Sequence, residues 1–166
     1  MSLALPYNPD MLKDGFFELQ TPVDLLKKLT HDFERVKSKP GDSYASFDFV
    51  VTARHLHDWA SNANIGWRPA EPLQRLAFKL CGDVADGAKH FVMRNKRPMG
   101  HTVVAGGIFG KATYGESTYG KELVIALTEE EAAIYGRGTT FYGHDAITMT
   151  ALAELMLTYW KTVLGE

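Results

Sequence analysis

The chain has 166 residues, of which 45% are hydrophobic and 23% are charged, and its formal net charge is −2. These values are typical of one globular domain with a single core, and they argue against a protein that binds nucleic acid over its whole surface. The single cysteine, Cys81, excludes an intramolecular disulfide, and no window of about 18 uncharged apolar residues predicts a membrane span. We therefore expect a cytoplasmic protein with no membrane partner.

Residues 1–20 carry prolines and a glycine without a sustained period, which predicts an extended lead-in to the domain. The first helix is predicted over 22–38. Thr21 can cap this helix, Pro22 suits its first position, and apolar residues three or four apart form one stripe along it.

A second helix is predicted over 43–62 with Ser43 as its cap, and a third over 71–91, so that residues 21–91 contain three helices. The apolar arc of the second helix is wide, and we expect it to be the most buried helix. Arg54 and Asp58 fall inside that arc and are four residues apart. They form either an internal ion pair that fixes the packing of the helix or one wall of a polar cleft.

The composition changes after the third helix, because residues 100–120 are rich in glycine. Short apolar runs at 103–104 and 123–127 predict two strands, so we expect a glycine-rich β excursion over 100–127. A final helix is predicted within 145–164 with Asp145 as its cap. The expected fold is a mainly α, single-domain protein over residues 1–166, a four-helix bundle with a glycine-rich β-hairpin inserted between helices three and four.

One flank of the third helix carries groups that can bind a metal. Asp83, Asp86 and His90 are three and four residues apart, and a helix brings such positions together. His57 on the second helix could complete the ligands of a divalent metal. In the alternative interpretation, Asp83 bonds a neighbouring helix and His90 bonds the carbonyls at the end of its own helix.

Residues 87–115 contain no Asp or Glu and five cations, which predicts a local basic surface despite the acidic total. Aromatic-glycine pairs recur in the same region and could stack bases, although such pairs are also ordinary in β turns. The residues predicted to bind a partner through this surface are Lys89, His90, Lys96 and Arg97.

An Arg-Asn pair begins the segment Arg94-Asn-Lys-Arg-Pro-Met-Gly-His101, and a His follows the Arg after six intervening residues. Together with the helical plan, this motif resembles the HEPN superfamily, helical-bundle proteins of prokaryotic defence and toxin-antitoxin systems. Many members are RNases that carry such an Arg and His. A second pair with the same spacing occurs at Arg137 and His144. The family places its motif at the start of a late helix, and this second pair comes nearer to that position.

More generally, the Asp58-Trp59 pair, residues 83–90 and the late Trp160 resemble the pattern of bacterial and phage-encoded proteins that have no assigned reaction. This resemblance spans most of the chain and implies no particular activity.

Three functions follow from these patterns. The first, implied by the HEPN resemblance, is a small RNase in which His101 or His144 is the acid/base and Arg94 or Arg137 holds the scissile phosphate. The second is a non-catalytic interaction protein, with an RNA or protein partner and a homodimer among the expected assemblies. The third is a metal-binding helical bundle; no other cofactor is indicated.

Overall fold

The computed structural model describes residues 18–89, 103–106, 122–136, 139–141 and 144–166. The helices within these ranges are α1 (Pro22–Ser38), α2 (Ser43–Asn62), α3 (Pro72–Lys89), α4 (Glu129–Tyr135) and α5 (Met149–Leu164). The strands are β1 (Val103–Gly106), β2 (Glu122–Ala126), β3 (Thr139–Phe141) and β4 (His144–Thr148). The prediction of a mainly helical protein is confirmed. No helix of the described ranges is long and apolar enough to cross a membrane.

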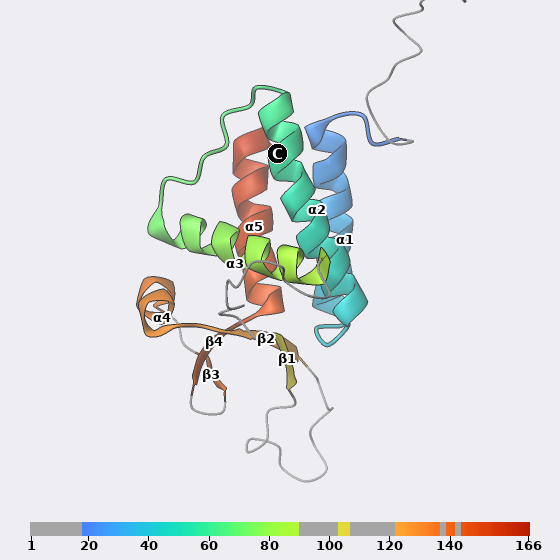
Figure 1. Ribbon diagram of the computed structural model, residues 1–166. Coiled ribbons are helices and arrows are strands. Elements are labelled where there is room, and N and C mark those ends of the chain that lie inside the picture. Colours follow the sequence, from blue (N-terminus) through green and yellow to red (C-terminus); the bar gives the residue numbers. More distant parts are fainter. Residues whose placement is uncertain (1–17, 90–102, 107–121, 137–138, 142–143) are drawn as a thin grey trace, which may run out of the picture.

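Helices α1, α2 and α5 lie side by side, and α3 lies across them (Figure 1). The sheet lies at one end of these helices, next to the start of α5, and α4 lies beside it (Figure 1). The four long helices therefore do not have the aligned axes of a regular four-helix bundle, and that part of the fold prediction is not confirmed.

Side-chain caps account for where the helices begin. Thr21 caps α1 and forms a reciprocal capping box with Asp24, in agreement with the prediction. The cap of α2 is Asp42 and not Ser43, because the Asp42 carboxylate accepts hydrogen bonds from the backbone N–H groups of Tyr44 and Ala45. The third helix ends at Lys89, whereas the prediction extended it to residue 91, which lies outside the described residues.

The sheet is antiparallel with the strand order β1-β2-β4-β3. Its first pair is the predicted one: β1 and β2 lie in register, with Val103 opposite Ile125. The glycine-rich residues 107–121 between these strands lie outside the described residues. The sequence analysis missed β3, β4 and α4, so the segment between the third and the last long helix is more than a hairpin.

The prediction that Asp145 caps the last helix is wrong. Asp145 lies within β4 and pairs with Thr140 of β3, and the last helix begins four residues later. Thr148 caps it by accepting a hydrogen bond from the backbone N–H of Ala151 at 3.1 Å. An isolated Asp before an apolar run is a good cap signal, but here strand pairing uses that backbone instead.

One core joins the helices and the sheet. Among its fully buried side chains are Phe49 and Leu56 from α2, Leu80 from α3, Ile125 from β2 and Trp160 from α5. The predicted stripe of α3 does face inward, since Leu76 and Leu80 are buried and Val84 packs against the core. Burial of this apolar stripe is the main contribution to the free energy that holds α3 against the other helices.

The interface between α1 and α2 also contains a polar network around a buried carboxylate. Asp32 is only 2% exposed, and its Oδ2 accepts hydrogen bonds from Lys28 Nζ at 2.5 Å and Thr52 Oγ1 at 2.8 Å. Arg35 lies 3.6 Å from the other oxygen of Asp32 and donates to Asp48 at 2.6 Å. That bond to Asp48 raises the pKa of Arg35, so the guanidinium stays charged.

The predicted burial of Arg54 and Asp58 is wrong, because both residues are exposed on α2. Asp58 Oδ1 lies 2.8 Å from His57 Nδ1, and no ion pair among the described residues joins it to Arg54. The predicted apolar arc of α2 is also too wide, because Phe47 is 45% exposed and the polar Thr52 is buried. Since α1, α3 and α5 cover only part of α2, the remaining face is left to solvent.

Cys81 gives a test of this packing. It is 2% exposed, and its Sγ lies 3.7 Å from the backbone oxygen of Val50. Burial raises the pKa of the thiol from 9.0 to about 12, although the nearby charge of Arg54 partly opposes the shift.

We expect Cys81 of the folded chain to resist iodoacetamide at pH 8, because the thiolate is the reactive form, and to react after unfolding in urea. The stability associated with this buried thiol is complete below pH 9.0 and declines as the pH rises toward about 12, since the unfolded chain then ionises first. Mass spectrometry of the alkylated chain measures the reaction. Rapid labelling of the folded protein would contradict the buried position.

Candidate functional site

The residues predicted for an RNase are not brought together by the described structure. Arg94, His101 and Arg137 lie outside the described residues. His144 begins strand β4, opposite Phe141 of β3, and is not at the start of a late helix as the family pattern requires. The second Arg/His pair therefore lacks the helical context that the HEPN resemblance implies.

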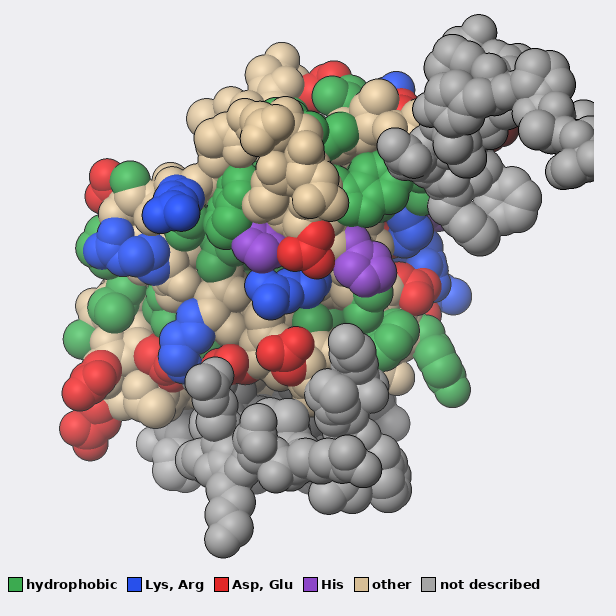
Figure 2. All heavy atoms as spheres, turned by 45° about the horizontal axis from the view of Figure 1, so that its top comes forward, with side chains coloured by type: hydrophobic (Ala, Val, Ile, Leu, Met, Phe, Trp, Pro, Cys, Tyr) green, Lys and Arg blue, Asp and Glu red, His purple; other side chains and the backbone are tan. Residues whose placement is uncertain are grey.

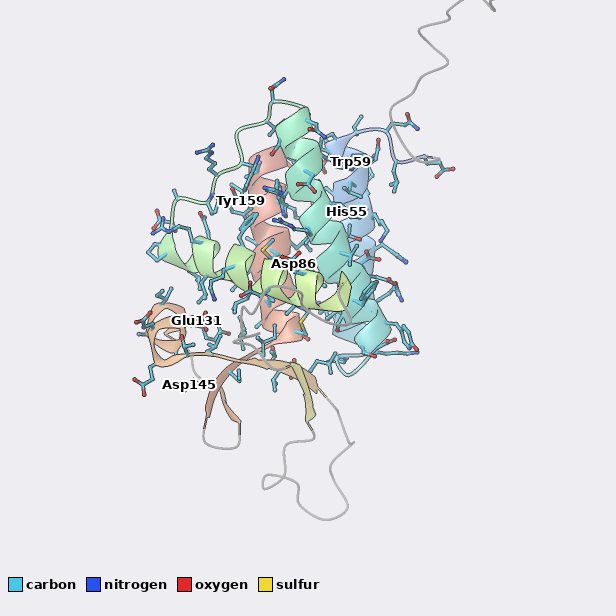
Figure 3. The ribbon with its side chains drawn as sticks, in the orientation of Figure 1. His55, Trp59, Asp86, Glu131, Asp145 and Tyr159 are labelled. Atoms are coloured by element: carbon cyan, nitrogen blue, oxygen red, sulfur yellow. The ribbon has the colours of Figure 1, made fainter. Side chains whose placement is uncertain are left out.

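The predicted metal ligands that can be located do not converge. Asp83 lies 3.4 Å from Lys79 Nζ, and Asp86 is exposed on α3 (Figure 3). His57 on α2 contacts Asp58 and packs edge-on against Trp67, with the ring centroids 4.1 Å apart. His90 lies outside the described residues, and within the described ranges no three His, Cys, Asp or Glu side chains gather as a metal site.

The predicted basic surface cannot be located in the same way. Lys89 is the last residue of α3, and its side chain is outside the described part of the structure. His90, Lys96 and Arg97 lie outside the described residues. The binding role of these four residues stays a prediction.

A groove with a volume of about 760 Å³ lies between α3 and α5 on the described surface. Tyr135 of α4 also lines it. Its length follows α5 from Ala151 to Val163, about 18 Å at the rise of an α-helix. Apolar side chains from both helices form its walls, among them Leu73, Ala77, Phe78, Ala151, Leu155 and Tyr159.

An aromatic cluster supports the floor of the groove. Phe78 packs against Tyr159, with ring centroids 4.8 Å apart, and both rings contact the buried Trp160 behind them. Trp67 from the α2–α3 connection stacks on Phe78 at 5.7 Å. Burial raises the pKa of Tyr159, so its hydroxyl stays neutral and this aromatic surface is uncharged.

The rim of the groove is acidic. Glu71 and Glu154 line it and are exposed, and no Lys or Arg is among the described residues that line it. Glu129 and Glu130 are exposed on the neighbouring helix α4, and Figure 2 shows acidic side chains gathered at the lower left of the described surface. Neither Glu71 nor Glu154 makes an ion pair with another described residue, so their charge is available to a ligand.

An ion pair links helix α4 to α3. Glu131 is 7% exposed, and its carboxylate closes the capping box of α4 with one oxygen while the other accepts a hydrogen bond from Lys79 Nζ at 2.7 Å. Desolvation by itself lowers the pKa of Lys79, but the bond to Glu131 and the charges of Glu131 and Asp83 outweigh it and raise the pKa. The pair ties α4 to α3, and Tyr135 is thereby positioned at the groove.

No protein-family model, no curated protein and no solved structure matches this chain. The chemistry of the groove must therefore be inferred from its own residues.

The sequence analysis missed the groove because its residues look like ordinary core positions. Leu155 and Tyr159 are four residues apart, the spacing of a buried stripe on a helix, and Glu154 is an ordinary polar neighbour. One signal was present: the buried arcs of α3 and α5 are both wide. The sequence of α3 or of α5 alone does not show that part of its apolar arc is left uncovered by the other helix.

Proposed function

We propose that this protein is a non-catalytic binding module whose groove between α3 and α5 takes the apolar face of a basic helix on a partner protein. The observation that carries the proposal is the combination of an apolar groove with an acidic rim and no described cation along it. Binding sites in proteins are typically concave and mostly apolar, with a few polar groups that set orientation, and the volume of about 760 Å³ lies in their usual range.

The shape favours a helix over a compact ligand. The groove is open along α5, and its length of about 18 Å corresponds to roughly three turns of an α-helix. Helix-in-groove recognition uses apolar side chains at every third and fourth position of the bound helix. Phe78, Leu155 and Tyr159 form the surface that such anchors would contact.

The charge favours a basic helix. Lysine or arginine side chains on the flanks of the bound helix would lie near Glu71 and Glu154, while an acidic helix would meet carboxylates on the same rim. Because the two glutamates are exposed, we expect them to affect specificity and association rate more than affinity.

The test uses two model peptides of three to four turns that have the same leucine stripe, one with lysine and one with glutamate at all other positions. We expect the lysine peptide to bind at least about tenfold more tightly in isothermal titration calorimetry. Glu154→Gln should weaken its binding and make it less sensitive to salt, and Leu155→Gln should abolish most of it.

Matched controls are Glu34→Gln, an exposed acid on α1, and Phe47→Gln, an exposed apolar residue on α2; neither lines the groove. Equal binding of the two peptides, or equal effects of groove and control variants, would refute the proposal. Self-association that Leu155→Gln alone disrupts would show that the groove binds a second copy of the chain instead.

The RNase, metal-binding and homodimer hypotheses stay predictions. No contact among the described residues supports an RNase site, and Arg94, His101 and Arg137 lie outside them. Cleavage of RNA without metal, abolished by His101→Ala or His144→Ala in a folded chain, would support the RNase hypothesis over the binding module.

A further inference from the structure

A second, smaller pocket lies between α1 and α2, away from the α3–α5 groove, with a volume of about 380 Å³. Four of its lining side chains are polar, namely Lys28, Asp48, Thr52 and His55, and they share the pocket with apolar neighbours that include Val51 and Trp59. Neither the RNase motif nor the proposed groove involves any of these residues.

Hydrogen bonds to neighbouring side chains hold two opposite charges at the pocket. Lys28 Nζ donates to the buried Asp32 at 2.5 Å and to Thr52 at 2.8 Å. Asp48 accepts from Arg35 at 2.6 Å. An ammonium and a carboxylate are therefore fixed at the pocket wall by hydrogen bonds, and a ligand would not have to order them.

The charges of this network balance. Two cations, Lys28 and Arg35, face two carboxylates, Asp32 and Asp48, so the sum is zero with neutral histidine. A ligand with a net charge would leave one charge unbalanced beside this neutral network, which is unfavourable. A ligand that carries one charge of each sign would match the ammonium and the carboxylate together.

We propose that this α1–α2 pocket binds a small zwitterion with an apolar body, the chemistry of a free apolar amino acid. Its carboxylate would interact with Lys28, whose ammonium has a third N–H beyond those given to Asp32 and Thr52, and with the imidazole of His55. Its ammonium would interact with Asp48, and its apolar body would pack on Trp59.

His55 and Trp59 are placed for these roles by helix geometry. They are four residues apart on α2, on the side of the helix next to α1 (Figure 3). His55 is exposed and Trp59 is half-buried, so the imidazole stands at the mouth of the pocket while the indole forms part of its wall.

The experiment titrates the full chain with L-leucine and L-phenylalanine by isothermal titration calorimetry. N-acetyl-L-leucine, which lacks the positive charge, and L-leucine amide, which lacks the negative charge, are the matched probes. We expect both analogues to bind at least about tenfold more weakly than L-leucine, because each lacks one of the two charge-assisted interactions with the pocket and brings an unbalanced charge to a neutral network.

His55→Ala and Asp48→Asn should each weaken the binding of L-leucine about fivefold to tenfold. His31→Ala, at an exposed histidine of α1 that does not line the pocket, is the matched control and should change nothing. Absence of saturable binding up to about 10 mM, equal binding of the analogues, or equal behaviour of His55→Ala and His31→Ala would overturn the proposal.

Discussion

Replacing Trp160 with alanine is expected to lower the free energy of unfolding by about 3–5 kcal/mol. The Trp160 side chain is fully buried, and its ring contacts Trp67, Phe78 and Tyr159 at centroid distances of 6.2, 5.7 and 5.4 Å. Alanine would leave a cavity among rigid rings that can collapse only in part. Urea denaturation followed by circular dichroism measures the loss.

Two further variants keep this prediction testable if the alanine variant does not fold. Trp160→Phe retains most of the ring contacts and removes an indole N–H that has no hydrogen-bond partner among the described residues, so a smaller loss of about 1–2 kcal/mol is expected. Tyr44→Ala removes a ring that is 79% exposed and should change stability little. Equal losses for Trp160→Ala and Tyr44→Ala would contradict the position of Trp160 in the core.

Replacing Lys28 with methionine is expected to destabilise the chain by about 2–3 kcal/mol, because it leaves the buried Asp32 carboxylate without its closest cation. Thr52 still donates to this carboxylate at 2.8 Å, and Arg35 lies 3.6 Å away, so the remaining charge is only partly compensated. The loss should be smaller than that of a fully buried pair, since the Lys28 side chain is itself 38% exposed.

A double-mutant cycle separates this charge effect from lost packing. Adding Asp32→Asn to Lys28→Met removes the buried charge, and the double variant should be more stable than the sum of the two single losses implies. Chemical denaturation of the four proteins provides the coupling energy. Strict additivity would show that Lys28 and Asp32 do not act as a pair.

Local signals predicted the long helices well. The Thr21 capping box and the regular leucines of α1 lie within a few residues of one another, so they act before any tertiary contact forms. The pair of strands that follows α3 could also be predicted, because two β-branched runs flank a glycine-rich segment. These are the features that depend on neighbours in sequence.

Other elements depend on partners that are distant in sequence. Asp145 has the residue type of a helix cap, yet its backbone pairs with Thr140 in the sheet. Arg54 and Asp58 lie on an arc that periodicity marks as apolar, but both are exposed, so no helix of the described ranges buries that side of α2. In both cases the burial or pairing of the residue depends on which surface another element covers. The sequence of a single helix or strand does not contain that information.

The candidate sites show the same difference between features that depend on nearby residues and features that depend on distant ones. Sequence patterns selected titratable groups close together along the chain, such as Asp83 and Asp86, and the structure does not gather them with His57 into a metal site within its described ranges. The α3–α5 groove and the α1–α2 pocket instead combine ordinary side chains from different helices, as when Lys28 meets Thr52 across 24 positions of sequence. Caps and periodicity act within a few residues, so local sequence was enough to predict the start of α1 and the existence of the four long helices, but not the start of α5 or the buried face of α2. Only the tertiary structure decided which surfaces stay uncovered and which charges meet, because these depend on how α3 and α5 cross and how α1 packs on α2.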